Sequence, residues 1–242
     1  LLRLDPLGVP IASGALAVGG VGEYANLDRV AVQPNGNIVV VGEYSAVALD
    51  LDLGAGITFL SDGGSPAGMV IQYTPTFGLG AFGQLFLFPE NGPFDMTDVA
   101  SDASGNVWVA GSFAATGATQ GLAGLTNSDP TGNTTDAFLL KLDGTTLTSL
   151  VERSYGRLGN DTATAVAVDA AGNAVLGGAF ELSADFDFTA GGAFTLTSSG
   201  GTDAFLLKLS ANGNFAWARQ VGGYLDDSIR DLAVDAPGNV YS

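Results

Sequence analysis

Aspartate is the residue type through which this sequence could most readily carry out chemistry. The chain has 242 residues with 25 acidic side chains against 8 basic ones, and it contains neither His nor Cys. That absence excludes thiol nucleophiles, Cys/His zinc sites and imidazole acid–base catalysis. Carboxylates remain, and they are hard oxygen ligands of the kind that Ca²⁺ prefers.

Two aspartate pairs alternate with apolar residues, which places each pair on one face of a predicted strand. Asp185 and Asp187 form one pair, and Asp50 and Asp52 occupy nearly the same place in an earlier repeat. We consider these four residues as Ca²⁺ ligands but favour solvent-facing carboxylates on an edge hairpin, because residues 114–117 of another repeat contain no acid. The chain also lacks the Asp-x-Asp-x-Asp-Gly loop of a dedicated calcium site. We therefore expect no cofactor, with Ca²⁺ as the single exception.

A third acidic group could provide the paired carboxylates of a glycoside hydrolase. It consists of Asp226, Asp227 and Asp231. Acidic residues recur at similar offsets in other repeats, at Asp28, Asp95 and Asp161. A catalytic pair would normally be unique, so the recurrence favours a role in capping loops. We expect no enzyme, and a glycoside hydrolase-like protein is the alternative.

The residues above belong to a sequence that repeats itself about three and a half times. One string occupies residues 30–37, 99–106, 166–173 and 232–239, and its Gly-Asn pairs lie 69, 67 and 66 residues apart. A second string keeps the same step at residues 1–4, 70–73, 139–142 and 206–209. A fixed period with strand-like units predicts a repeat architecture, which has to be interpreted unit by unit.

The first string predicts a tight hairpin in every unit. In the best-preserved copy, residues 165–168 form a strand, Asp169 opens a turn that Gly172 closes, and residues 173–180 return. Five residues past each Asn stands a glycine, at positions 42, 111 and 178, which predicts a close backbone approach or a bulge. Seven residues past each Asn stands an aromatic residue, which we expect to fill the space between neighbouring sheets. These are Tyr44, Phe113 and Phe180.

The rest of each unit supplies two more strands. Residues 203–209 and 215–219 form them in the best copy, and an inserted hairpin pairs residues 185–188 with 193–197. Four antiparallel strands in a unit of this size are typical of a propeller blade, and the apolar run 205–207 suits a sheet buried on both faces. The sequence predicts no helix of useful length. The predicted fold is therefore an all-β propeller of four blades, each of about 67 residues.

We predict a single domain over residues 1–242. Three units span about 21–88, 89–156 and 157–223, and residues 1–20 with 224–242 form a fourth blade split between the two ends of the sequence. The split blade allows three interpretations: a compact ring with a trimmed blade, a fragment of a longer array, or an open edge that a neighbouring subunit fills to give a filament or sheath. The contact in the last case would involve the residues nearest the split, namely Leu1, Leu2, Leu4, Val240, Tyr241 and Ser242.

The repeat also resembles a known family. Residues 185–188, 194–205 and 208–209, followed by Gly-Asn-Phe-Ala-Trp-Ala at 213–218 and Gly222-Gly223, are similar to the SBBP-type bacterial β-propeller repeat. The resemblance covers essentially the whole chain and is loosest over 46–97. The first unit departs from it, with Gln33 in place of the turn Asp and Gln72 in place of Lys. The resemblance implies a secreted or surface protein without catalytic activity.

Charge and composition limit the classes of partner that the chain can bind. The net charge is −17 and Lys and Arg never cluster, so nucleic acid and anionic membranes are excluded as partners, and no apolar run is long enough for membrane insertion. No signal peptide is visible at residues 1–5, so the chain is either cytosolic or a mature or trimmed form. The split blade favours the second, and we expect a bacterial-type chain located outside the cell or on its surface.

The predicted function is a non-catalytic structural or interaction role, in which the chain self-assembles or contacts other surface proteins. The alternative is a ligand-binding module that recognises a glycan through exposed aromatic residues, although packing is the favoured role for the two tryptophans. The aromatic candidates are Tyr24, Trp108, Tyr155, Trp217 and Tyr224.

Overall fold

The structure is a computed structural model that describes residues 2–7, 10–15, 24–45, 49–50, 59–60, 67–76, 84–87, 94–114, 124–187 and 192–242. Strands and turns make up these residues, and no helix occurs among them, so the prediction of an all-β fold is confirmed. It follows that the described part of the chain holds no helix long and apolar enough to cross a membrane.

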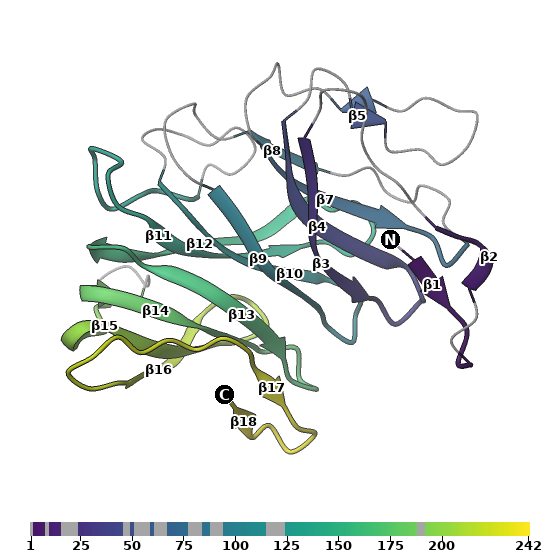
Figure 1. The fold of residues 1–242 in the computed structure, drawn as a ribbon. Coiled ribbons are helices and arrows are strands. Elements are labelled where there is room, and N and C mark those ends of the chain that lie inside the picture. Colours follow the sequence, from purple (N-terminus) through teal and green to yellow (C-terminus); the bar gives the residue numbers. More distant parts are fainter. Residues whose placement is uncertain are drawn as a thin grey trace.

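Antiparallel strands pair in chain order within three successive four-stranded units (Figure 1). The first unit contains β3 (Tyr24–Val32), β4 (Ile38–Ser45), β7 (Ala67–Tyr73) and β8 (Gln84–Leu87). The second contains β9 (Phe94–Ser101), β10 (Val107–Phe113), β11 (Asp136–Leu142) and β12 (Ser149–Leu158). The third contains β13 (Thr162–Val168), β14 (Ala174–Asp185), β15 (Thr195–Leu209) and β16 (Phe215–Val221).

Three short strand pairs stand outside these units. They are β1 (Leu2–Leu4) with β2 (Pro10–Ala15), β5 (Leu49–Asp50) with β6 (Phe59–Leu60), and β17 (Ala233–Val234) with β18 (Val240–Tyr241). The pair β5–β6 follows β4 in the chain, where the inserted hairpin is predicted. In the third unit that hairpin is confirmed as an extension of β14 and β15, in which Asp185 pairs with Thr195.

The second and third units form one curled, eight-stranded sheet. The end of β12 leaves its own unit and pairs with the end of β14, where Gly156 lies opposite Asp185 and Leu158 opposite Ser183. The start of β14 pairs with β13 instead. The first strands of successive units also lie side by side. Between β9 and β13, for example, the Thr97 hydroxyl donates to the carbonyl oxygen of Ala163 at 2.7 Å.

The hairpin turn between the first and second strands has the same backbone hydrogen bond in all four copies, and an aspartate opens it in every copy except the first, where Gln33 stands instead. In the third unit, the N–H of Gly172 donates to the carbonyl oxygen of Asp169 at 2.9 Å, and Gly172 has a φ of 81°. Oδ1 of Asp169 accepts from the N–H groups of Ala171 and Asn173 at 3.0 and 2.9 Å. The predicted division of labour is confirmed: the aspartate caps the turn, and the glycine supplies the left-handed backbone conformation.

The glycine five residues past each Asn faces a β-bulge in the first strand, as predicted. In the second unit the register between β9 and β10 shifts at Gly111, and a Cβ at Gly111 would lie 2.0 Å from the carbonyl oxygen of Asp95. Gly42 and Gly178 meet the carbonyl oxygens of Asn26 and Thr162 in the same way, each at 1.9 Å. Only glycine allows the bulged strand to come this close.

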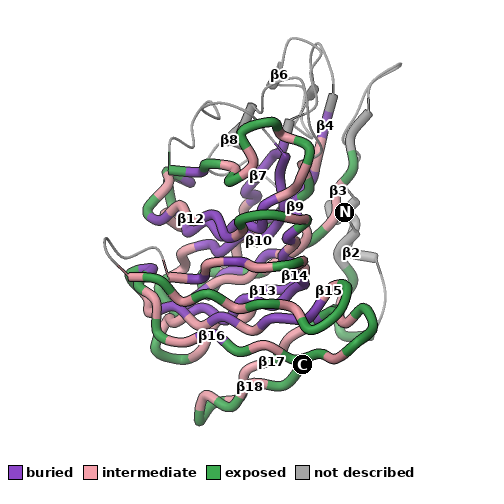
Figure 2. Tube along the Cα trace, turned by 90° about the vertical axis from the view of Figure 1, so that its left-hand side faces the viewer, coloured by how far each residue is buried: buried purple, intermediate pink, exposed green. Residues whose placement is uncertain are grey.

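The hydrophobic core of the described residues consists of two clusters, each of which joins residues of neighbouring units. One cluster joins Val39 and Val70 of the first unit to Phe113 and Phe138 of the second. A second cluster joins the second and third units, with Phe180 at its centre among residues of both. Tyr44, Phe113 and Phe180 are all buried, which confirms their predicted packing role, and Figure 2 shows the buried positions running through the middle of the stacked strands.

The two outermost strand pairs do not meet in this structure. Among the described strands, β1 pairs only with β2, and β17 only with β18. In Figure 1 the pair β1–β2 with the N mark and the pair β17–β18 with the C mark lie apart.

Candidate functional site

The predicted calcium ligands fall on the hairpin beyond β14 and on β5. Oδ1 of Asp185 accepts from the N–H groups of Asp187 and Phe194 at 3.1 and 2.9 Å, so this carboxylate closes the hairpin. Asp50 ends β5, but its side chain and all of Asp52 lie outside what the structure describes. Within the described residues, no group of three or more acidic side chains could hold a metal ion. Calcium binding by these four residues stays a prediction.

The three aspartates that could suggest hydrolysis each cap a nearby backbone group. Oδ1 of Asp226 accepts from the N–H of Thr202 at 3.0 Å, and Oδ2 of Asp227 accepts from the N–H of Gly223 at 2.9 Å. Asp231 accepts from the N–H of Leu232 at 2.8 Å. Asp227 and Asp231 therefore cap backbone groups of their own loop, as predicted, whereas Asp226 bonds to β15. That the group is not catalytic stays a prediction.

The residues predicted to mediate self-association lie at separate edges. Val240 and Tyr241 form β18, and the Tyr241 hydroxyl donates to Oδ2 of Asp235 at 3.0 Å while 57% of the residue is exposed. Ser242 borders an open hollow of about 490 Å³ that Val221, Ile229 and five other residues also line. Leu2 and Leu4 belong to β1, and half of Leu4 is exposed. Leu1 lies outside the described residues.

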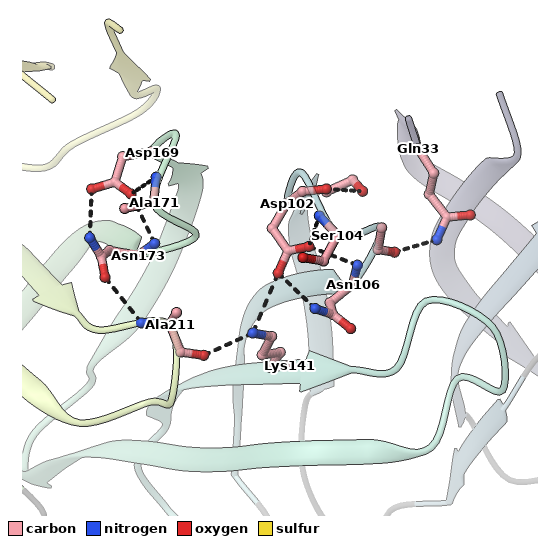
Figure 3. A network of polar contacts seen from close by, with 11 residues as sticks. Gln33, Asp102, Ser104, Asn106, Lys141, Asp169, Ala171, Asn173 and Ala211 are labelled. Atoms are coloured by element: carbon pink, nitrogen blue, oxygen red, sulfur yellow. Dashed lines mark hydrogen bonds and ion pairs between the residues drawn. The ribbon is translucent and has the colours of Figure 1, made fainter. Parts of the chain in front are cut away.

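Ion pairs link the turn aspartates of the second and third units to the third strand of the same unit, and Figure 3 shows the one between Asp102 and Lys141. Nζ of Lys141 lies 3.4 Å from Oδ2 of Asp102, and Nζ of Lys208 lies 2.8 Å from Oδ2 of Asp169. Partial burial acts to raise the pKa of Asp169, but hydrogen bonds from Lys208 and Asn173 outweigh it and lower the pKa to about 2. These aspartates are therefore ionised and hold the hairpin and the third strand together.

Lys141 also connects two units. Its ammonium donates to the carbonyl oxygen of Ala211 in the third unit at 2.8 Å and lies 4.9 Å from the ring centre of Trp108. Trp108 is buried beneath it, which confirms the packing role predicted for this aromatic residue. The side chain thus combines an ion pair, a cation–π contact and an inter-unit hydrogen bond.

The first unit replaces the ion pair with two glutamines. Nε2 of Gln72 donates to Oε1 of Gln33 at 2.6 Å and to the carbonyl oxygen of Gly144 in the second unit at 2.7 Å. Nε2 of Gln33 donates to the carbonyl oxygen of Gly105 at 2.5 Å. The two departures from the repeat therefore act together. A neutral pair of amides replaces the ion pair and makes the same two connections, from the hairpin turn to the third strand and from one unit to the next.

An acidic cluster that the sequence did not single out lies at the bulged first strands. Burial, followed by the charges of Asp95 and Asp28, raises the pKa of Glu43 in β4 to about 7. Burial likewise raises the pKa of Asp98, whose Oδ2 accepts from the N–H of Val166 at 2.8 Å and so ties β9 to β13. The position of Asp98 beside the bulge is the one signal that could have revealed it.

The sequence predicted a loop-capping role for Asp161 but not the burial of carboxylates at the unit junctions. Asp136 and Asp161 are 2% and 1% exposed at the junction of the second and third units, and Asp203 is fully buried at the next junction. Burial and the charge of Asp136 raise the pKa of Asp161 to about 8. Asp136 begins β11 and Asp203 lies within β15, at the same repeat position, which is the signal that could have identified them.

Aromatic side chains divide between core and surface. Tyr155 is buried between units, whereas Tyr224, in the loop after β16, is 92% exposed. The side chain of Tyr24 lies outside the described residues, and Trp217 in β16 is half-buried.

Comparison with known proteins gives no relative. No known family matches the chain, and no curated protein is significantly similar to it. The resemblance to the SBBP-type repeat therefore stays a prediction, and the function has to be argued from the geometry.

Proposed function

We propose that this chain is a non-catalytic β-propeller scaffold, located outside the cell or on its surface, that assembles by completing a split blade with strands of a neighbouring copy. The observation that carries the proposal is the recurrence of one four-stranded unit, with the first strands of successive units side by side.

The propeller interpretation rests on how the units stack. In a propeller the blades pack face to face and the first strand of each blade lies nearest the axis. The contacts of β9 with β3 on one side and β13 on the other fit this arrangement, and β17 contacts β13 next in the series. The hydroxyl of Thr164 in β13 extends it by donating to the carbonyl oxygen of Ile229 at 2.5 Å. A four-bladed ring is the fold we propose.

The pair β17–β18 has the form of the first hairpin of a fourth blade. Asp235 caps the turn through its bonds to Asn239, at 2.7 Å from both the backbone and side-chain nitrogens, as its counterparts do. Yet β18 pairs on one side only, whereas its counterparts β4, β10 and β14 each pair on both sides. An open strand edge of this kind recruits another strand.

Strand β1 fits that edge in sequence and in charge. Residues 1–4, Leu-Leu-Arg-Leu, include β1 and align with the third strands of the units. In the second unit, Trp108 of the second strand pairs with Lys141 of the third strand, and Val107 pairs with Leu142. The same register would place Leu4 opposite Val240 and Arg3 opposite Tyr241. Among the described residues Asp235 has no basic partner, and Arg3 would provide one as Lys141 does for Asp102. Since the two pairs lie apart in the structure, we propose that the strand comes from a second copy.

Disulfide trapping tests the register. The chain has no Cys, so Leu2→Cys with Ser242→Cys gives a single engineered pair that the register places face to face. On a non-reducing gel we expect a ladder of cross-linked copies. A fast-migrating cross-linked monomer would favour closure within one chain, and the absence of any cross-link would contradict the pairing. Leu7→Cys with Ser242→Cys is the matched control and should remain uncross-linked.

Glycan binding is the second candidate function. It is favoured by the exposed ring of Tyr224 and by Leu225 beside it, which is also exposed. A glycan array with the wild type and Tyr224→Ala tests it: binding that is lost in the variant would support this function, and no binding would exclude the glycans tested.

A further inference from the structure

The junctions between successive units contain more buried oxygen acceptors than donors. At the junction of the second and third units, Oδ2 of Asp161 is buried with no hydrogen-bond partner. The backbone N–H groups of Arg157 and Glu181 hydrogen-bond to the same carboxylate, and the one from Glu181 reaches Oδ1 at 3.3 Å. A buried ionised oxygen without a partner is costly, so something has to satisfy it.

A second carboxylate oxygen points at the same place. A methyl group on the α-carbon of Gly156 would lie 2.3 Å from Oδ1 of Asp136 and 2.8 Å from Oδ2 of Asp161. The two oxygens are therefore no more than about 5 Å apart, which is the span of two Ca²⁺–oxygen bonds. Neither residue forms an ion pair among the described side chains.

Neutral oxygens complete the surroundings. Oγ of Ser128 lies 2.8 Å from Oδ1 of Asp136 and 2.8 Å from the carbonyl oxygen of Arg157, but a hydroxyl has one proton and can serve only one of them. Oγ1 of Thr135, next to Asp136 in the chain, is also buried without a partner. The cluster thus offers carboxylate, hydroxyl and carbonyl oxygens, and the single proton of the Ser128 hydroxyl has two acceptors within reach.

The next junction repeats the pattern. Oδ1 of Asp203 is buried without a partner, as is Oγ of Ser198. A methyl group on Gly222 would lie 2.7 Å from that Oδ1, so Gly222 takes the place of Gly156. The N–H of Asp227 donates to the carbonyl oxygen of Thr202 at 2.7 Å, as that of Asp161 donates to Thr135, so the second aspartate is in the equivalent position too. A buried carboxylate oxygen without a partner thus occurs at both junctions, on Asp161 at one and on Asp203 at the other, where the second oxygen of Asp203 accepts from the N–H of Ser199 at 3.0 Å.

We propose that two junctions each hold a Ca²⁺ ion: the junction of the second and third units, where Asp136 and Asp161 would bind it with the oxygens of Ser128 and Arg157, and the junction that follows the third unit, where Asp203 and Asp227 would bind it. The set contains oxygen atoms only, which selects a hard cation, and two carboxylates match a divalent charge. These sites are distinct from the aspartates on the inserted hairpin, where Oδ1 of Asp185 already accepts hydrogen bonds from two backbone N–H groups. Such an ion would join neighbouring units and is independent of whether the chain self-assembles.

Calorimetric titration of the chelator-treated wild type with CaCl₂ tests the proposal. We expect saturable uptake of about two ions per chain and, at a hundredfold excess over Kd, a rise in Tm of about 5 °C or more. Asp161→Asn keeps the acceptor for the Glu181 N–H and should lose one ion, and Asp203→Asn should lose the other. Asp185→Asn is the matched control and should bind both.

Two results would overturn the proposal. No uptake by the wild type would mean that a proton alone satisfies the carboxylates, and uptake abolished by Asp185→Asn but not by Asp161→Asn would place the ion on the hairpin. Terbium provides a readout on the wild type that does not depend on the folding of any variant. Because Tyr155 precedes Gly156, we expect Tyr-sensitised Tb³⁺ emission that Ca²⁺ displaces, and its absence would also count against the site.

Discussion

Replacement of Gly111 by alanine adds a single methyl group, yet it should strongly destabilise the fold. A Cβ there would lie 2.0 Å from the carbonyl oxygen of Asp95 and 2.5 Å from Cζ of Phe138, and neither the bulged strand nor the buried ring can move away without disturbing the junction core. Overpacking of this kind destabilises a protein by about 3 kcal/mol. Alanine also lowers the conformational entropy of the unfolded chain, which offsets less than about 1 kcal/mol of this loss. The net loss of about 2–3 kcal/mol corresponds to a fall in Tm of roughly 4–12 °C for a domain of this size.

Thermal and urea unfolding followed by circular dichroism measure the effect. The control is Gly223→Ala, because a Cβ at Gly223 meets nothing within 4 Å. We expect its Tm to stay within about 1–2 °C of the wild type. Equal stabilities of the two variants would refute the argument that the repeated glycine exists to admit the bulge.

Further predictions concern the charged groups. Asp102→Gln and Lys141→Gln should each destabilise the fold, but the double variant should lose less than their sum by about 1–3 kcal/mol, because it recreates the glutamine pair of the first unit; additive losses in urea unfolding would contradict this. The pKa of Glu43 is raised to about 7, so the folded state binds its proton more tightly, and stability should fall as the pH rises from about 4.5 to 7. After a discount for solvent screening this effect is about 1 kcal/mol, and Glu43→Gln should remove it; an unchanged pH profile would count against the cluster. Arg3→Glu should weaken self-association, and adding Asp235→Arg should restore it in analytical ultracentrifugation.

Backbone constraints could be predicted from the sequence because the repeat reveals them. Gly111 and Phe113 recur at one offset from Asn106, and a position that tolerates only glycine or only an aromatic residue implies a close approach or a core contact. The Asp169 turn was predictable for the same reason, since its hydrogen bonds stay within five residues.

Contacts between units were not predictable in the same way. Asp136 and Asp161 are 25 positions apart and meet only because β12 turns into the next unit, which no local pattern encodes. Gln33 and Gln72 were visible as departures from the repeat, but their hydrogen bond depends on the pairing of β4 with β7. The periodicity therefore predicts each unit better than the junctions where the chemistry lies.

Electron microscopy of the purified chain tests the central claim most directly. If β1 of one copy completes the blade that β17 and β18 begin in the next, the material should form filaments or tubes with one propeller per repeat, and Arg3→Glu should disperse them. Discrete particles of single-subunit mass in the wild type would contradict assembly through the split blade.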